Sequence, residues 1–251
     1  MIYVQCFLHC RFIVCYVHFI HYLMFSYYGS KSKIVHLYPT PKFDKIIEPF
    51  AGSARYSLRF WQKDILLVDK YPVIVDVWNY LKNASEKDIL GLPKLKQGER
   101  IDDFNLSKIE KHFLGFVVCN STGERKQVTM LVKDISQSLK NIANQLFKIR
   151  HWNIKLDSYE NIENENATWF IDPPYMFGGE HYKQSNKNLD FKKLREWCKS
   201  RNGQIIVCEN SKADWLDFKP ICKMRGSIRE TTEVIWSNVP TEFDYQMQSL
   251  F

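Results

Sequence analysis

The sequences DKIIEPFAGSARYSLRFW (residues 44–61) and DILLVDKYPVIVDVWNYLKN (residues 64–83) follow the same pattern one after the other. Each starts with a short apolar run typical of a buried strand, passes through a turn and continues as an amphipathic helical pattern. In the first unit we expect a helix that begins near Ser53 and includes Tyr56, Leu58 and Phe60, and in the second a strand at 65–68 and a helix after Pro72. Two successive strand–turn–helix units predict an α/β fold with a doubly wound, mostly parallel sheet.

The same alternation returns after residue 151. We expect a strand near 152–159, a strand that ends at Asp172, a helix over 190–203 capped by Gly203, and a strand over 204–210. The apolar run TTEVIWSN at 231–238 predicts a last strand, paired antiparallel at the edge of the sheet.

Residues 85–150 interrupt this alternation with charged and apolar residues at helical spacing, which predicts a small helical insertion. Residues 82–150 hold 13 Lys or Arg against 8 Asp or Glu, so this region carries much of the basic excess. A solvated helical face explains that charge as well as a nucleic-acid contact does. Residues 24–84 and 151–251 are then expected to form the main domain around the insertion.

Composition narrows the class of protein. The chain has 251 residues, a formal net charge of +7 and seven cysteines that form no CxxC pair. The charge weakly favours a polyanionic partner, and the cysteine pattern fits neither a disulfide framework nor a metal site, so we expect a reduced, intracellular protein. Residues 1–23 are apolar with Arg11 as their one charge, and we interpret them as an extension outside the fold, with no membrane partner.

Two features of the first units suggest a ligand site. Gly52 lies in a strand-to-helix turn, where the backbone can approach a ligand and the helix amino terminus offers N–H groups to an anion. Asp69 follows about twenty residues later at the end of the next strand, the spacing of a carboxylate that binds ribose hydroxyls. The alternatives are a tight packing turn at Gly52 and a helix cap at Asp69.

The run Asp172-Pro173-Pro174-Tyr175 directly follows the apolar residues 169–171. Consecutive prolines cannot continue a strand, so the chain must leave the sheet at Asp172. Open α/β sheets bind ligands at this end of their strands, which favours a site. The alternative is a strand-terminating turn with an ordinary solvated aspartate.

Four stretches of the chain together resemble the DNA adenine-N6 methyltransferase family. In the family's order they are Tyr27-Tyr28-Gly29-Ser30-Lys31, Glu48 to Ala54, Asp69 and the DPPY run. The resemblance spans roughly residues 24 to 240. It implies a Rossmann-like, S-adenosylmethionine-dependent methyltransferase acting on double-stranded DNA, of the α group, in which residues 85–150 would be the target-recognition region. Ala54 departs from the more usual glycine.

The resemblance also implies roles for individual residues. The catalytic ones would be Asp172, Pro173, Pro174 and Tyr175, with Asp172 and the Pro173 carbonyl accepting the adenine amino hydrogens and Tyr175 stacking on the flipped base. The residues expected to bind the cofactor are Tyr27, Lys31, Glu48, Phe50, Gly52, Asp69 and Asp172. Tyr28 and Asp157 are weaker candidates for the cofactor site, and Gly178, Gly179, His181 and Tyr182 for a flap that contacts DNA.

Other activities stay open at this stage. They are N4-cytosine methylation, methylation of RNA or of a protein amide, and binding of nucleic acid by an inactive relative. Asp172 favours adenine, because serine or asparagine more often precedes the two prolines in the other enzymes. The recognised DNA sequence, the oligomeric state and the existence of a cognate restriction endonuclease do not follow from the sequence.

Overall fold

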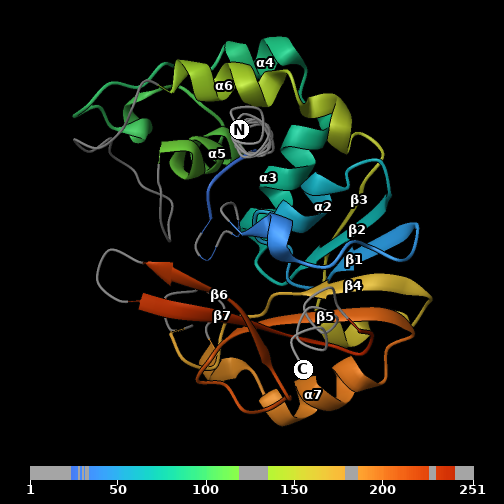
Figure 1. Ribbon diagram of the computed structural model, residues 1–251. Helices are drawn as coiled ribbons and strands as arrows, with labels where there is room; N and C mark the ends of the chain where they lie inside the picture. The colour runs from blue at the N-terminus through green and yellow to red at the C-terminus, as the bar shows by residue number, and fades with distance from the viewer. Residues whose placement is uncertain are drawn as a thin grey trace, which may run out of the picture.

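A seven-stranded sheet forms the centre of the protein in the computed structural model, which describes residues 24–27, 29, 31, 34–118, 135–178, 186–225 and 230–240 (Figure 1). Within these residues the strand order is β3-β2-β1-β4-β5-β7-β6. The strands are β1 Lys45–Glu48, β2 Asp64–Asp69, β3 Asn153–Leu156, β4 Ala167–Ile171, β5 Gly203–Asn210, β6 Lys219–Arg225 and β7 Glu230–Ser237. The pairs among β1 to β5 are parallel, and β7 runs antiparallel to both β5 and β6. This is a Rossmann-like, mostly parallel α/β sheet, as the sequence predicts.

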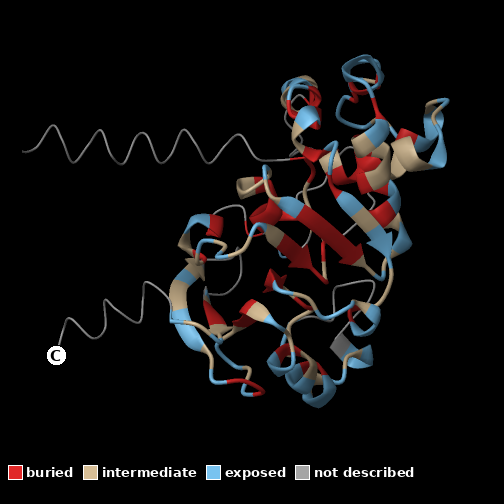
Figure 2. Ribbon diagram, turned by 90° about the vertical axis from the view of Figure 1, so that its right-hand side faces the viewer, coloured by how far each residue is buried: buried red, intermediate tan, exposed pale blue. Residues whose placement is uncertain are grey.

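Helices cover both faces of the sheet. Successive strand residues point to opposite faces, and on the central strands the residues on both faces are apolar and buried. On β1, Ile46 packs into one apolar cluster with α2 (Arg55–Arg59) and α3 (Pro72–Asn83), whereas Ile47 packs into another with α7 (Phe191–Lys199). Figure 1 shows α7 on one side of the sheet and the other labelled helices on the opposite side, and Figure 2 shows the central strands coloured mainly as buried. The doubly wound arrangement is therefore confirmed.

The strand order reverses at β1. The chain runs from β1 to β2 and β3 on one side and then returns to place β4 and β5 on the other. The carboxyl ends of β1 and β4 therefore diverge at a switch point, which is where open α/β sheets bind ligands. Glu48 ends β1, Asp69 ends β2 and Asp172 follows β4, so all three carboxyl groups lie at this edge of the sheet.

Three local expectations need correction. The closing strand β7 is not at the edge, because β6 pairs along its outer side. Gly203 does not cap α7; it opens β5 at φ +100, where an added Cβ would lie 2.2 Å from the carbonyl oxygen of Ala167. The helix after Gly52 begins at Arg55, and Phe60 is its C-cap.

The insertion extends the core of the main domain on the α3 side. Its helices are α4 Glu86–Leu90, α5 Lys108–Val118 and α6 Ser136–Ala143, with the short 3-10 segments η2 Ile101–Asp103 and η3 Leu146–Ile149. Phe116 of α5 contacts Phe25, with ring centroids 5.5 Å apart, and Tyr27, at 5.8 Å. The predicted recognition region is thus packed directly against the segment that leads into the site.

Residues 1–23, Tyr28, Ser30, Gly179, His181 and Tyr182 lie outside the described residues. No helix in the part of the chain that the structure describes combines the length and apolar character needed to cross a bilayer.

Candidate functional site

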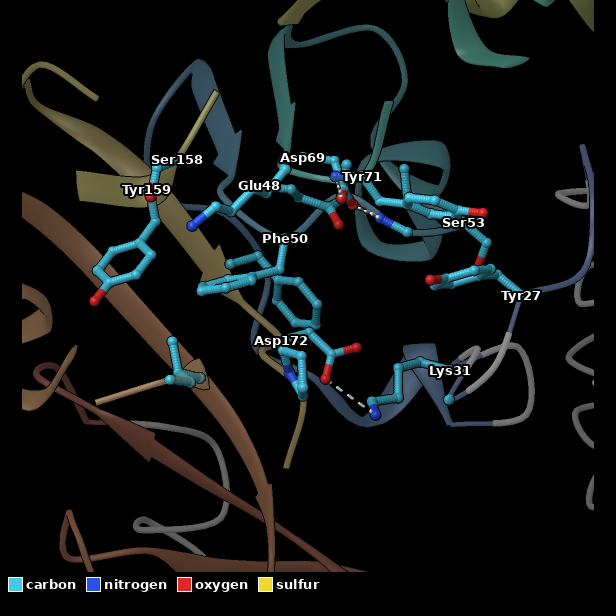
Figure 3. A pocket seen from close by; sticks show the side chains of 18 of the residues that line it. Tyr27, Lys31, Glu48, Phe50, Ser53, Asp69, Tyr71, Ser158, Tyr159 and Asp172 are labelled. Carbon is cyan, nitrogen blue, oxygen red and sulfur yellow. Dashed lines mark hydrogen bonds and ion pairs between the residues drawn. The ribbon is translucent and has the colours of Figure 1, made fainter. Parts of the chain in front are cut away.

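A cavity of about 330 Å³ opens at the carboxyl ends of β1, β2 and β4. Its walls come from the turn at 50–55, from residues 69–71, 158–160 and 188–190, and from side chains of the amino-terminal segment. Of the predicted site residues, it is lined by Tyr27, Lys31, Glu48, Phe50, Gly52, Asp69, Asp172 and Pro174. Figure 3 shows Tyr27 and Lys31 on one side, Ser158 and Tyr159 on the opposite side, and Phe50 between them.

The turn that follows β1 has an unusual backbone. Gly52 has φ +45, and an added Cβ would lie 3.3 Å from Cδ1 of Tyr27, so the Tyr27 ring covers the glycine closely. The Gly52 carbonyl accepts a hydrogen bond from Trp78 Nε1 at 2.9 Å, which ties the turn to α3. Ala54 also adopts a left-handed conformation, with φ 44 and ψ 46. This conformation favours glycine, the residue more usual at this position in the resembling family. Alanine at position 54 therefore strains the backbone in addition to adding a methyl group.

Asp69 supports this turn from the end of β2. Its Oδ2 accepts the Gly52 N–H at 3.0 Å and its Oδ1 accepts the Tyr71 N–H at 2.8 Å. Burial raises the pKa of Asp69 to about 6, while these backbone hydrogen bonds oppose the rise. Each carboxylate oxygen has a second lone pair, so Asp69 can still accept hydrogen bonds from a ligand in the cavity.

Glu48 contacts the protein more than the cavity, since the residue is 2% exposed. Its Oε1 accepts the Ser57 N–H at 2.7 Å, at the amino end of α2. Burial raises the pKa of Glu48 to about 8, and the bonds from Ser57 lower it only in part. The sequence suggests free N–H groups for an anion at this helix terminus. The carboxyls of Glu48 and Asp69 take two N–H groups of the turn and helix, those of Ser57 and Gly52.

Asp172 and Lys31 form an ion pair at one end of the cavity, with Lys31 Nζ 3.1 Å from Asp172 Oδ1 (Figure 3). The side chains are 20% and 5% exposed, respectively. Burial raises the pKa of Asp172 to about 6; Glu233 adds to the rise and Lys31 opposes it. At neutral pH the Asp172 carboxyl is therefore mainly ionised and can accept hydrogen bonds from a ligand.

Tyr175 lies behind this pair. Its hydroxyl accepts a hydrogen bond from Lys31 Nζ at 2.5 Å and donates one to Glu233 Oε1 at 2.6 Å. Lys31 Nζ also lies 4.4 Å from the centre of the Tyr175 ring. A base that stacks on this ring has to use its other face. Glu233 is not predictable as a site residue, because one acidic residue in an apolar strand does not reveal its partners.

Glu209, at the end of β5, holds the turn after Asp172. It is fully buried, and its Oε1 accepts the Met176 N–H at 2.6 Å. Burial raises the pKa of Glu209 to about 7. Glu209 is absent from the predicted site, although an acidic residue at the end of an apolar strand is the signal that singles out Asp69 and Asp172.

The other end of the cavity is aromatic. Phe50 and Tyr159 have ring centroids 5.4 Å apart and an interplanar angle of 30°. Asp157 is not part of these walls; it accepts hydrogen bonds from the Ser158 N–H and from Asn161 Nδ2, both at 2.7 Å, beside the 3-10 segment η4 (Tyr159–Asn161). Asp157 therefore stabilises the chain around η4 and does not line the cavity.

The sequence matches no protein-family model and no curated protein. Among solved structures, the chain is similar to one described as "putative methyltransferase yhhF" from Escherichia coli, with 9% identity, a TM-score of 0.34, and 77% of this chain and 74% of that one covered. It is also similar to "putative methylase HI0767" from Haemophilus influenzae, with 10% identity, a TM-score of 0.34, and coverages of 78% and 80%. Likenesses at this level do not bear on the activity.

Proposed function

We propose that this protein transfers a methyl group from S-adenosylmethionine to the N6 amino group of adenine in DNA. The observation that carries the proposal is the shared cavity. The Asp172 carboxyl, on the stiff turn after β4, faces the same space as the Gly52 turn and Asp69 at the switch point of the sheet.

The cavity suits a nucleoside that carries an amino-acid chain. Phe50 and Tyr159 offer apolar ring faces to a purine, and Asp69 offers acceptor oxygens to ribose hydroxyls. Tyr27 and the Gly52 turn line the path toward Asp172. The bound cofactor supplies an electrophilic methyl group on its sulfonium.

The protein's own part is to position and polarise the adenine amino group. Its lone pair is delocalised into the ring, so the nitrogen is a poor nucleophile. Asp172 and the Pro173 carbonyl accept its two hydrogens and turn the lone pair toward the methyl group. Two prolines and the bond from Met176 N–H to Glu209 hold these acceptors in place, which lowers the entropy lost on reaching the reactive geometry.

Lys31 acts on Asp172 in this scheme. Its ammonium lies between the carboxylates of Asp172 and Glu233, at 3.1 Å and 3.7 Å. The resemblance also implies that Lys31 binds the cofactor, and that contact stays a prediction.

Double-stranded DNA is the proposed partner. The basic region over 82–150 supplies cations for phosphates, and the predicted reading role of 85–150 stays a proposal. Phe177 is 48% exposed directly after the DPPY turn, where an aromatic ring can stack on a base that has left the duplex. Asn210 Nδ2 donates to the Phe177 carbonyl at 2.6 Å and so fixes the backbone that presents the ring.

The experiment is methylation of duplex DNA with radiolabelled S-adenosylmethionine, followed by digestion to nucleosides. We expect label in N6-methyladenine. The Asp172→Asn variant keeps the side-chain volume and should lose at least about 100-fold in kcat while it still binds the cofactor in calorimetry. Label in N4-methylcytosine, label only with RNA or protein, or unchanged turnover of Asp172→Asn would each refute the proposal.

A further inference from the structure

A second buried carboxylate lies behind the Asp172 turn. Glu233 on β7 is 1% exposed, and its Oε1 accepts hydrogen bonds from Tyr175 at 2.6 Å and from Tyr38 at 2.7 Å. Its Oε2 is buried without a hydrogen-bond partner among the described residues. Burying a carboxylate in this way costs free energy, so its position calls for a compensating role.

Two carboxylates share one ammonium at this point. Lys31 Nζ is 3.1 Å from Asp172 Oδ1 and 3.7 Å from Glu233 Oε1. The three side chains are 5%, 20% and 1% exposed, so water screens their charges weakly. When both acids are ionised, the negative charge of Glu233 repels that of Asp172 and competes with it for Lys31.

We propose that Glu233 is a positioning residue for Asp172: by sharing the Lys31 ammonium and holding Tyr175, it determines the pH at which the reacting carboxyl ionises. The inference rests on the proposed function only for the role of Asp172 in the reaction. Without the charge of Glu233, Lys31 would serve Asp172 alone, and Asp172 would ionise at lower pH. Without Lys31, the change would be in the opposite direction.

The tyrosines and cysteines at this point stay neutral near pH 7. Burial raises the pKa values of Tyr38, Tyr175 and Cys208 on β5, and also that of Cys222 on β6. Among the charged groups, Lys31 lowers the pKa of Asp172 and Glu233 raises it. Asp172 in turn raises the pKa values of Glu48 and Glu209, whose carboxyls are unchanged in every variant of the test below.

This arrangement has a chemical use. The methylated amino nitrogen is cationic and must lose a proton. Its N–H bond breaks, the electron pair stays on nitrogen and the proton forms an O–H bond at Asp172, from which it passes to water. A carboxylate whose pKa lies near neutrality accepts such a proton more readily than an ordinary aspartate.

The test is a pH titration of protein labelled with ¹³C at the aspartate carboxyl carbons, read by NMR, with Asp172→Asn to assign the signal. In Glu233→Gln, which keeps an acceptor oxygen for both tyrosines, the Asp172 midpoint should fall by about half a pH unit or more. In Lys31→Gln it should rise. Tyr38→Phe removes one hydrogen bond to the same oxygen without changing a charge, and should leave the midpoint in place.

A midpoint in Glu233→Gln that equals or exceeds the wild-type value overturns the inference.

Activity supplies a further readout. The acidic limb of the kcat profile should move to lower pH in Glu233→Gln, whereas a purely structural role would lower kcat at all pH values without moving the limb. The NMR titration requires no methyl transfer. If the Asp172 midpoint shifts in Glu233→Gln but the wild-type protein forms no N6-methyladenine, the proposed function is refuted and the coupling is supported. If the wild-type protein forms N6-methyladenine but the Asp172 midpoint does not shift in Glu233→Gln, the proposed function is supported and the coupling is refuted.

Discussion

Replacing Glu48 by glutamine should remove a pH-dependent loss of stability. The Glu48 carboxyl is buried and accepts the Ser57 N–H at the start of α2. Glutamine keeps an acceptor oxygen of the same reach but cannot ionise. The variant therefore removes the charge of residue 48 while it keeps the hydrogen bond to the helix.

The sign and size follow from the pKa. Burial raises the pKa of Glu48 from 4.5 to about 8, so between these values the folded protein holds a proton that the unfolded chain has lost. The stability contribution of this proton is complete below pH 4.5 and decreases as pH rises through about 8. Above that pH the ionised Glu48 costs at most about 5 kcal/mol, since a pKa difference of one corresponds to about 1.4 kcal/mol.

The assay is urea unfolding at several pH values for both proteins. From about pH 5.5 to about pH 7.5 the wild-type protein should lose about 3 kcal/mol of unfolding free energy relative to Glu48→Gln. Asp69, Asp172 and Glu209 titrate in both proteins, so their contributions largely cancel in the difference.

A difference between the two proteins that stays constant within about 0.5 kcal/mol over this range would refute the reasoning, because Glu48 would then be ionised in the folded state. Calorimetry with S-adenosylmethionine separates the structural role from the predicted ligand role. We expect the affinity of Glu48→Gln to stay within about threefold of wild type, since its carboxyl contacts the helix.

Three further outcomes are expected. Gly52→Ala should weaken cofactor binding about tenfold, because the added Cβ would lie 3.3 Å from Tyr27. The control is Gly98→Ala, at φ +87 with nothing within 4 Å of the added Cβ, which should cost about 1 kcal/mol of stability and leave cofactor affinity unchanged. Calorimetry measures the affinity and urea unfolding the stability. Ala54→Gly should change stability by less than about 1 kcal/mol, because relief of the left-handed backbone strain offsets the loss of the methyl group. The control Ala143→Gly, at the end of α6, should cost about 2 kcal/mol. Equal losses in urea unfolding would argue against backbone strain at Ala54. Phe177→Ala should raise the KM for DNA at least about fivefold with cofactor binding unchanged, as loss of base stacking costs about 1–3 kcal/mol; an unchanged KM would exclude the contact.

The repeated strand–turn–helix units could be predicted because their signals are local. An apolar run followed by a glycine or proline turn and a helical period defines each unit within about forty residues. Once the strands are parallel, their carboxyl ends must share one edge, so Asp69 and Asp172 come together without further information. This is why the candidate cavity contains most of the predicted site residues.

Strand β6 and the position of β7 could not be predicted in the same way. The sequence of β6, KPICKMR, has a proline and three basic residues and lacks the apolar pattern of a buried strand. Such residues are tolerated at a sheet edge, where one side of the strand has no partner. The pairing of β6 with β7 depends on the neighbouring strand and not on the periodicity of β6 itself. The sequence therefore predicts β7 at the edge position that β6 occupies.

The sequence by itself determined the fold class and the edge of the sheet that bears the site, because hydrophobic periodicity and turn chemistry act over short stretches of chain. Only the tertiary structure decided which charges meet. Lys31 lies 141 positions before Asp172 in the sequence, and Tyr175 and Glu233 are separated by 58, so no local pattern connects them. Their ionisation depends on burial and on neighbours at 3–4 Å, and both arise only when the sheet closes over them.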